Sequence, residues 1–594
     1  MPCDVTITSD MSYDFIVSAD EEERIDLPPE CIQRINDNYS IYYYNRAQLP
    51  PLSIEAYSYS SIPNCFGLLD TEALEKSGIL TLQNQPALSL RGQGVLIGFI
   101  DTGIAYELAC FQNPDRTTRI AAIWDQTSQG GNPPEGFLYG VEYERGQLNQ
   151  ALAAENPLEV VPQRDENGHG TLLASIACGS EDPINDFVGA APECELLVVK
   201  CKPAKQYLKE FYFIPENALV YQENDIMAAV AYLDAKARSL GKPLVICLGL
   251  GTNNGSHSGS SVLSDYLSEV GGTWGRCVVI ASGNEANARH HFLGQSLGSR
   301  IDGGSLAPGG TIAGGTINGG TISGGEGSAI PSAATEEMVA VEIDVEQSME
   351  GFYLELWANA PELFAVSVRA PGGAVFPGAG RNLGHQQYSF IFEGTTVEID
   401  YRTVGRTRGD QLIFVRFDNV SRGIWTLLVY PQATITGQFH VWLPMTGMLK
   451  QDVFFLEPNP ENTLTTPSSA TTPITVGGYQ TGNGALYLES GRGYTTTGVV
   501  KPDFTAPAVE VFGVNLRGNP TTGTGTSVAA AITSGACAQL FEWGVVRGNN
   551  VFLNSVEIGN RLILGSQRDS GRTYPNTQWG YGKLDVARTL ARWT

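Results

Sequence analysis

The chain has 594 residues, a length that predicts three or four units at roughly 150 residues per domain. A hydrophobic content of 42% with only 17% charged residues is typical of a globular protein and excludes a largely disordered chain. The formal charge of −26 at pH 7 disfavours nucleic acid and anionic membranes as partners, because phosphate groups repel an acidic chain.

Residues 1–66 predict a small α+β unit at the N-terminus. Tyr13–Ser18 and Ile41–Tyr44 are short apolar runs typical of strands, and Glu22–Asn36 predicts a helix that two prolines interrupt. An extended tail follows, over Leu52–Phe66. No segment resembles a signal peptide, and no apolar run approaches the roughly 20 residues of a membrane span, so we expect an intracellular protein.

Residues 67–300 and 451–594 predict two parts of one α/β domain. Short buried runs alternate with helical patterns, which indicates a parallel sheet covered on both faces. The runs are Val95–Ile100, Leu196–Lys200, Leu244–Gly249 and Cys277–Ala281, and the helices are His169–Cys178, Asn224–Ser239 and Ser527–Trp543.

The region between these two parts has a different character. Residues 301–335 hold a GGTI repeat, which predicts a glycine-rich surface insertion. Residues 336–450 contain many short runs of alternating apolar and polar residues, such as Phe352–Leu356 and Phe364–Val368. They predict an antiparallel β-sandwich of jelly-roll type, inserted within the α/β domain.

Cysteine and histidine suggest no metal site. The ten cysteines include no C-x-x-C pair, so reduced buried thiols are expected and not a disulfide framework. The pair His290-His291 lacks a Cys or carboxylate partner at the spacing of a zinc site and is predicted to be a surface pair. His257 lies in a serine- and glycine-rich loop and is predicted to be solvated.

Three segments carry groups suited to nucleophilic catalysis. Asp101 ends a buried strand, His169 opens a helix in the run DENGHGT, and Ser527 lies at another helix start in GTGTSVAA. A serine hydroxyl needs a base to take its proton, histidine can serve near neutral pH, and a carboxylate orients the imidazole. Asn284, after the strand IASGN, could donate a hydrogen bond to the oxyanion.

These segments resemble those of the subtilisin-like serine proteases, also called subtilases or peptidase family S8. The matching motifs cover about residues 85–300 and 470–590; they are IDTG, NGHGT, CLGLG, ASGN, KPDFTAPA, GTSVAA and WGYGKLD. Leu172 departs from the pattern, because relatives often have a second histidine there.

The resemblance implies a catalytic triad of Asp101, His169 and Ser527, with Asn284 as oxyanion donor. It also implies that Leu248, Gly249, Leu250 and Gly251 line the site and pair with the substrate backbone. The expected activity is that of a serine endopeptidase on a protein or peptide substrate, without a cofactor. Family members often hold calcium, for which Asp182 and Asp186 are the candidates, but no calcium site is assigned.

The N-terminal unit and the inserted sandwich resemble those of the Csp germination proteases of clostridial spores. This narrower resemblance implies that residues 1–66 are a prodomain, which its own enzyme cuts and which stays a partner in the cleft. We expect the cut between Ser60 and Gly67, and the resemblance allows a spore location. The alternative is a catalytically weak or inactive protease fold that serves in binding or signalling.

Overall fold

The computed structural model describes residues 3–18, 28–68, 77–86, 88–296, 338–376, 384–404 and 409–593. The GGTI repeat lies outside these ranges. Within them, no helix has both the length and the apolar character that crossing a membrane requires.

An eight-stranded sheet forms the centre of the α/β unit, in the order β24-β23-β12-β10-β5-β8-β6-β7. Neighbouring strands are parallel except for the antiparallel edge pair β6 and β7. In chain order the strands are β5 (Leu96–Asp101), β6 (Ile120–Asp125), β7 (Val141–Glu144), β8 (Glu195–Lys200), β10 (Leu244–Leu248), β12 (Arg276–Ala281), β23 (Ile474–Tyr479) and β24 (Phe504–Pro507). The predicted parallel sheet and its four buried runs are confirmed.

Helices cover both faces of this sheet. Within β5, Ile97 and Phe99 belong to one core cluster, which also contains residues of α5 and α9, whereas Leu96 and Ile100 belong to a second, with α7 and α8. The helices are α2 (Ile79–Asn84), α3 (Arg145–Ala153), α4 (Pro157–Val160), α5 (His169–Cys178), α6 (Gln206–Phe211), α7 (Glu223–Ser239), α8 (Val262–Gly272), α9 (Thr526–Phe541), α10 (Ser555–Gly565) and α11 (Val586–Trp593). Buried on both faces, the strands read as continuous apolar runs.

The N-terminal residues form a three-stranded antiparallel sheet in the order β1-β3-β2, beside a short helix. Its elements are α1 (Cys3–Thr8), β1 (Ser12–Ser18), β2 (Cys31–Arg34) and β3 (Tyr39–Asn45). The two predicted strands are confirmed. The prediction of a helix over Glu22–Asn36 is wrong for residues 28–36, the described part of that range. Cys31–Arg34 is a strand that pairs with β3 and buries every second residue.

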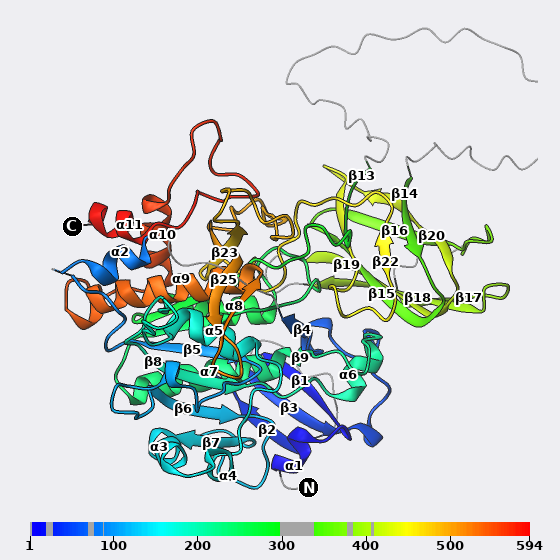
Figure 1. Cartoon of the computed structure of the whole chain (residues 1–594). Coiled ribbons are helices and arrows are strands. Elements are labelled where there is room, and N and C mark those ends of the chain that lie inside the picture. Colours follow the sequence, from blue (N-terminus) through cyan, green and yellow to red (C-terminus); the bar gives the residue numbers. More distant parts are fainter. Residues whose placement is uncertain are drawn as a thin grey trace, which may run out of the picture.

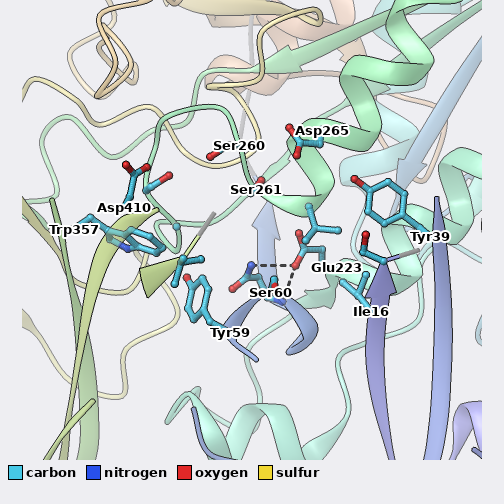
Figure 2. A pocket seen from close by; sticks show the side chains of 16 residues that line it. Ile16, Tyr39, Tyr59, Ser60, Glu223, Ser260, Ser261, Asp265, Trp357 and Asp410 are labelled. Atoms are coloured by element: carbon cyan, nitrogen blue, oxygen red, sulfur yellow. Dashed lines mark hydrogen bonds between the residues drawn. The ribbon is translucent and has the colours of Figure 1, made fainter. Parts of the chain in front are cut away.

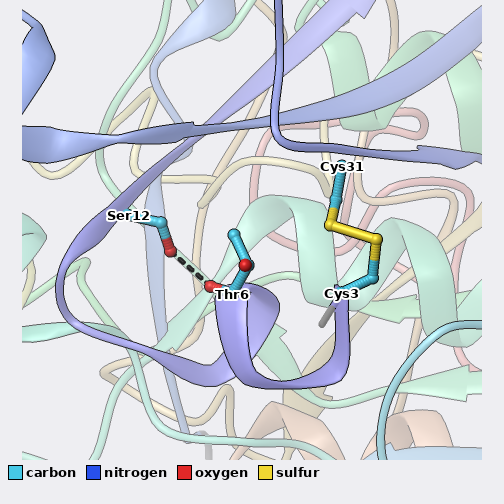
Figure 3. The surroundings of a disulfide bond; sticks show 4 residues. All are labelled: Cys3, Thr6, Ser12 and Cys31. Carbon is cyan, nitrogen blue, oxygen red and sulfur yellow. Dashed lines mark hydrogen bonds between the residues drawn. A yellow bond between two sulfur atoms is a disulfide. The ribbon is translucent and has the colours of Figure 1, made fainter. Parts of the chain in front are cut away.

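One disulfide ties this N-terminal unit together. Cys3 in α1 and Cys31 in β2 are 28 residues apart in sequence, but their Cα atoms lie 5.6 Å apart (Figure 3), a normal disulfide span. The other eight cysteines are free thiols, and all but Cys110 are buried. The expectation of reduced cysteines therefore holds for eight and is wrong for this pair, which strand pairing brings together.

Two antiparallel sheets lie beside the α/β unit (Figure 1). They have the orders β13-β21-β15-β19-β18-β17 and β16-β20-β14-β22, and one apolar cluster contains residues of both. The strands are β13 (His291–Gln295), β14 (Val339–Val345), β15 (Met349–Ala358), β16 (Leu363–Arg369), β17 (Gln386–Phe390), β18 (Thr395–Val404), β19 (Asp410–Val420), β20 (Gly423–Ala433), β21 (Gln438–Trp442) and β22 (Val453–Phe455). We call them the two-sheet unit. Its first and last strands fall outside the range 336–450 expected from the sequence.

The two-sheet unit joins the α/β unit through the outward face of β15. Tyr353 and Glu355 alternate with the inward apolar residues, and both are buried. Glu355 accepts hydrogen bonds from the Asn254 side chain at 3.1 Å and the Gly255 N–H at 2.8 Å, and Tyr353 donates to Asn254 at 2.8 Å. Asn254 and Gly255 lie just beyond residues 248–251 of the candidate site, so the contact holds this loop against β15.

Several histidines also lie at this junction, and their predicted surface positions are wrong. His257 is only 3% exposed and stacks on Trp442 of β21 at 4.1 Å between ring centroids. His290 approaches Glu285 at 3.0 Å, and His291 lies 3.0 Å from His440. Burial lowers the pKa of His257 to about 4, so the ring is neutral at pH 7.

Candidate active site

Three elements of the α/β unit bring the predicted catalytic residues together. Asp101 is the last residue of β5, His169 is the first of α5, and Ser527 is the second of α9. The carboxyl ends of parallel strands, where such folds bind their ligands, lie on the same edge of the sheet. Residues separated by 68 and 358 positions therefore meet there.

The distances among these groups suit proton transfer. His169 Nδ1 lies 2.8 and 2.9 Å from the two oxygens of Asp101, and Nε2 lies 3.3 Å from Ser527 Oγ. A carboxylate can only accept, so Nδ1–H donates to Asp101 and leaves Nε2 as the acceptor for the serine proton. All three side chains are buried, with Asp101 1% exposed, so their interactions are weakly screened by solvent.

A second carboxylate, which the sequence interpretation missed, holds the start of α5. Asp165 accepts from the Gly168 N–H at 2.8 Å, the Thr171 N–H at 3.0 Å and the Thr171 hydroxyl at 2.7 Å. These bonds satisfy backbone donors that have no partner within the helix. An aspartate just before a helix start is a capping signal, and it could have been recognised in DENGHGT.

Asn284 lies beside the serine through its contact with Thr526. Its Oδ1 accepts from the Thr526 N–H at 3.1 Å and from the Thr526 hydroxyl at 3.2 Å. The amide orientation is thereby fixed, and the donor Nδ2 projects from the other side of the same group. The N–H of Ser527 is among the first four of α9, which have no acceptor within the helix. Two donors are thus available near the serine.

Residues 248–251 bring backbone close to the catalytic groups. A Cβ on Gly249 would lie 2.9 Å from Cβ of Ser527 and 3.4 Å from a ring carbon of His169. Leu248 and Leu250 point into the core and are fully buried, so their side chains are not the contact surface. What this segment offers a ligand is its main chain and the space that Gly249 leaves.

The chain's own N-terminal tail pairs with that main chain. Strand β4 (Cys65–Leu68) lies between β9 (Tyr221–Gln222) and β11 (Leu250–Gly251) in a three-stranded antiparallel sheet. An extended segment that adds a strand in this way is a common mode of peptide recognition. Residues 65–68 therefore occupy the strand position beside Gly249.

Glu223, at the start of α7, fixes the tail just before β4. Its carboxylate accepts from the Asn64 N–H at 3.2 Å and the Asn64 side chain at 3.0 Å, and its own N–H donates to the Asn64 carbonyl at 2.9 Å. Burial raises the pKa of Glu223 to about 7. Figure 2 shows Glu223 in a cavity that Tyr39 of the N-terminal sheet and Trp357 of the two-sheet unit also line.

Asp182, one of the candidate calcium ligands, makes hydrogen bonds within its own loop. Asp182 accepts from the Ile184 N–H at 3.1 Å and from the Asn185 side chain at 2.7 Å, as in a local turn. Among the described residues, no group of three or more His, Cys, Asp or Glu side chains is arranged to hold a metal ion.

Comparisons with known proteins found one matching family model and several similar structures. The Peptidase_S8 model of the subtilase family matches residues 92–323 and 452–582. The solved Clostridium perfringens CspB protease aligns over 87% of this chain and 97% of its own, with 28% identity and a TM-score of 0.71. The prenylagaramide maturation protease PagA and sphericase, at 12% and 15% identity, each give a TM-score of 0.40. No curated protein sequence matches the chain.

Proposed function

This chain belongs to the subtilase family and resembles the CspB protease, and from that premise we propose that it is a serine endopeptidase that matures by cutting its own N-terminal tail. The observation that carries the proposal is the hydrogen-bonded line of Asp101, His169 and Ser527 beside β4. Its substrate is a protein or peptide bound as an extended strand.

The proposed reaction follows from the positions of these groups. His169 Nε2 takes the proton of Ser527 as Oγ attacks the carbonyl carbon, and the negative charge passes to the carbonyl oxygen. The Ser527 N–H and Asn284 Nδ2 stabilise that oxyanion. His169 then returns the proton to the leaving amine, and water, deprotonated by the same ring, hydrolyses the acyl-enzyme.

An inactive protease fold with a binding role is less well supported. A protein that only binds a partner does not need His169 Nε2 within 3.3 Å of the buried Ser527 hydroxyl. It also does not need the buried Asp101 carboxylate hydrogen-bonded to the same imidazole ring. A fluorophosphonate probe separates the two functions, because it reacts with an activated serine. We expect labelling at Ser527 once the tail has been cut and removed, whereas an unlabelled protein would favour the binding role.

Replacing Asn284 tests the oxyanion donor. Asn284→Asp keeps an oxygen to accept from Thr526 but removes the donor, so we expect kcat to fall by about 10²–10³ with a small change in KM. That range comes from a subtilisin, a member of the same family. Steady-state hydrolysis of a peptide substrate measures it. A fall of less than threefold would contradict the assignment.

We further propose that residues 1–66 and the first residues after them act as a prodomain. Support comes from β4, which lies in the strand position of a substrate, and from Glu223, which holds Asn64 just before it. The N-terminal sheet also packs on the α/β unit, with Phe15 and Ile16 in its two core clusters. We likewise propose that the two-sheet unit is an inserted β-sandwich that steadies the loop at Asn254.

The register of β4 favours a bond beyond the range expected from the sequence. Gly67 lies opposite Gly251 and Leu68 opposite Leu250, and Gly249, the residue just before β11, lies against Ser527. The tail therefore approaches the hydroxyl with Leu68 nearest among its described residues. We propose cleavage on the carboxyl side of Leu68, and not between Ser60 and Gly67.

The mass of the matured protein checks this position. We expect a new N-terminus at Leu69, read by intact-mass measurement and N-terminal sequencing. The Ser527→Ala chain serves as the uncut control. A new N-terminus before residue 67, or an intact Met1 in an active preparation, would show that the register does not describe the processed bond.

A further inference from the structure

A groove lies on the side of His169 that β4 does not occupy. Asn167, His169 and Leu172 line one wall, and Leu516, Arg517 and Thr521 line the other. The second wall belongs to the hairpin of β25 (Val509–Val514) and β26 (Pro520–Thr524). The groove holds about 660 Å³, within the size range of ligand-binding clefts.

The hairpin is held firmly against α5. The Val514 N–H donates to Ser175 Oγ at 2.9 Å, and a Cβ on Gly513 would collide with Leu172 at 2.5 Å. At the hairpin tip, Asn515 Oδ1 accepts from the Arg517 N–H at 2.9 Å. The groove therefore has a fixed wall, and its tip presents Arg517 to solvent.

The position of the groove identifies which part of a substrate reaches it. A peptide that follows β4 passes Ser527 and continues on the far side, where His169 protonates the leaving amine. The lining includes His169 but no residue of β9 or β11. The groove is thus on the leaving-group side of the cut bond.

The groove is lined mostly by polar side chains, together with two leucines and one basic residue at the hairpin tip. Leu172 and Leu516 are partly exposed there, and Arg517 is exposed. Arg517 has no ion pair with any residue that the structure describes. In the sequence, the segment after Leu68 is Leu69–Glu75, LDTEALE, which contains two leucines and three carboxylates. This composition complements the groove.

We propose that this groove binds an acidic segment on the leaving-group side of the cut bond, with Arg517 pairing to a carboxylate. Its first occupant is the chain's own segment Leu69–Glu75, and later substrates share its acidic, leucine-bearing character. This inference rests on the proposed protease function and extends it to the choice of substrate.

Charge reversal with rescue tests the pairing in the full chain. Cell-free synthesis followed over time by mass spectrometry gives the rate of self-processing. We expect Arg517→Glu to slow it by about three- to tenfold, as for a partly exposed charged hydrogen bond. The double change Asp70→Lys, Glu72→Lys should slow it similarly, and adding Arg517→Glu to that pair should restore the rate to within about twofold of wild type.

The controls separate this inference from the proposed function. Arg588→Glu reverses an exposed charge on α11, far from the groove residues in sequence, and should process at the wild-type rate. Thermal unfolding of each uncut Ser527→Ala version checks that the folds are equal. A wild-type chain that is never cut overturns the protease function and this proposal with it. Two results overturn the groove proposal alone. In the first, the Arg517→Glu chain and the Asp70→Lys, Glu72→Lys chain are both processed at the wild-type rate. In the second, the chain that combines these changes is processed more slowly than either.

Discussion

Replacing Ser527 with alanine is expected to abolish both peptide hydrolysis and cutting of the tail. The side chain supplies the only atom that bonds to the substrate carbonyl in the proposed reaction, and the Cβ of alanine cannot take its place. The loss in kcat should be on the order of a millionfold, a figure that comes from subtilisin, a member of the same family. Mass spectrometry of the purified chain and a peptide assay measure the two effects.

The same helix offers a matched control for this substitution. Ser534 is also buried in α9, where its hydroxyl donates to the Ala530 carbonyl at 2.8 Å. Ser534→Ala removes the same atom from the same helix but away from His169, so processing and hydrolysis should persist. A Ser527→Ala chain that still matures when made alone would contradict the assignment of the nucleophile.

Replacing Asp101 with asparagine is expected to lower kcat by about ten-thousandfold with little change in the fold. The amide group can donate to Nδ1, which favours the tautomer with its proton on Nε2. That nitrogen then faces Ser527 Oγ as a donor and cannot take its proton. The lost negative charge would also have stabilised the imidazolium. Single-turnover kinetics with a peptide substrate separate this effect from substrate binding.

Asp125 is the matched control for Asp101. It ends β6, which β8 separates from β5 in the sheet, is also buried, and accepts from the Thr127 N–H at 2.8 Å. Asp125→Asn should therefore alter stability modestly and leave kcat within about twofold. Equal losses in the two variants would mean that Asp101 acts through the fold and not through His169.

The residues of the proposed triad were predictable from the sequence because their local signals are strong. Asp101 ends a buried apolar run, and His169 and Ser527 begin helices next to glycines, so the ends of the elements were readable from short-range patterns. The parallel sheet followed from the alternation of buried runs with helices.

Other features depended on contacts between residues far apart in the sequence. The helix predicted through Cys31–Arg34 is a strand because β3 pairs with it, and that pairing also brings Cys3 to Cys31. His257 looked solvent-exposed in its serine- and glycine-rich loop, but Trp442 of the two-sheet unit stacks on its ring. Local composition carries no information about what another unit will cover.

The sequence by itself determined which groups are available for chemistry and which elements carry them, because those signals lie within a few residues of each group. The tertiary structure decided how the tail meets the site. The register of β4 against β11 makes Leu68, and not an earlier residue, the described residue of the tail that lies nearest to Ser527. It also placed the hairpin tip with Arg517 in the lining of the same groove as His169. Strand register and loop placement are set by packing over hundreds of residues, which no local pattern encodes.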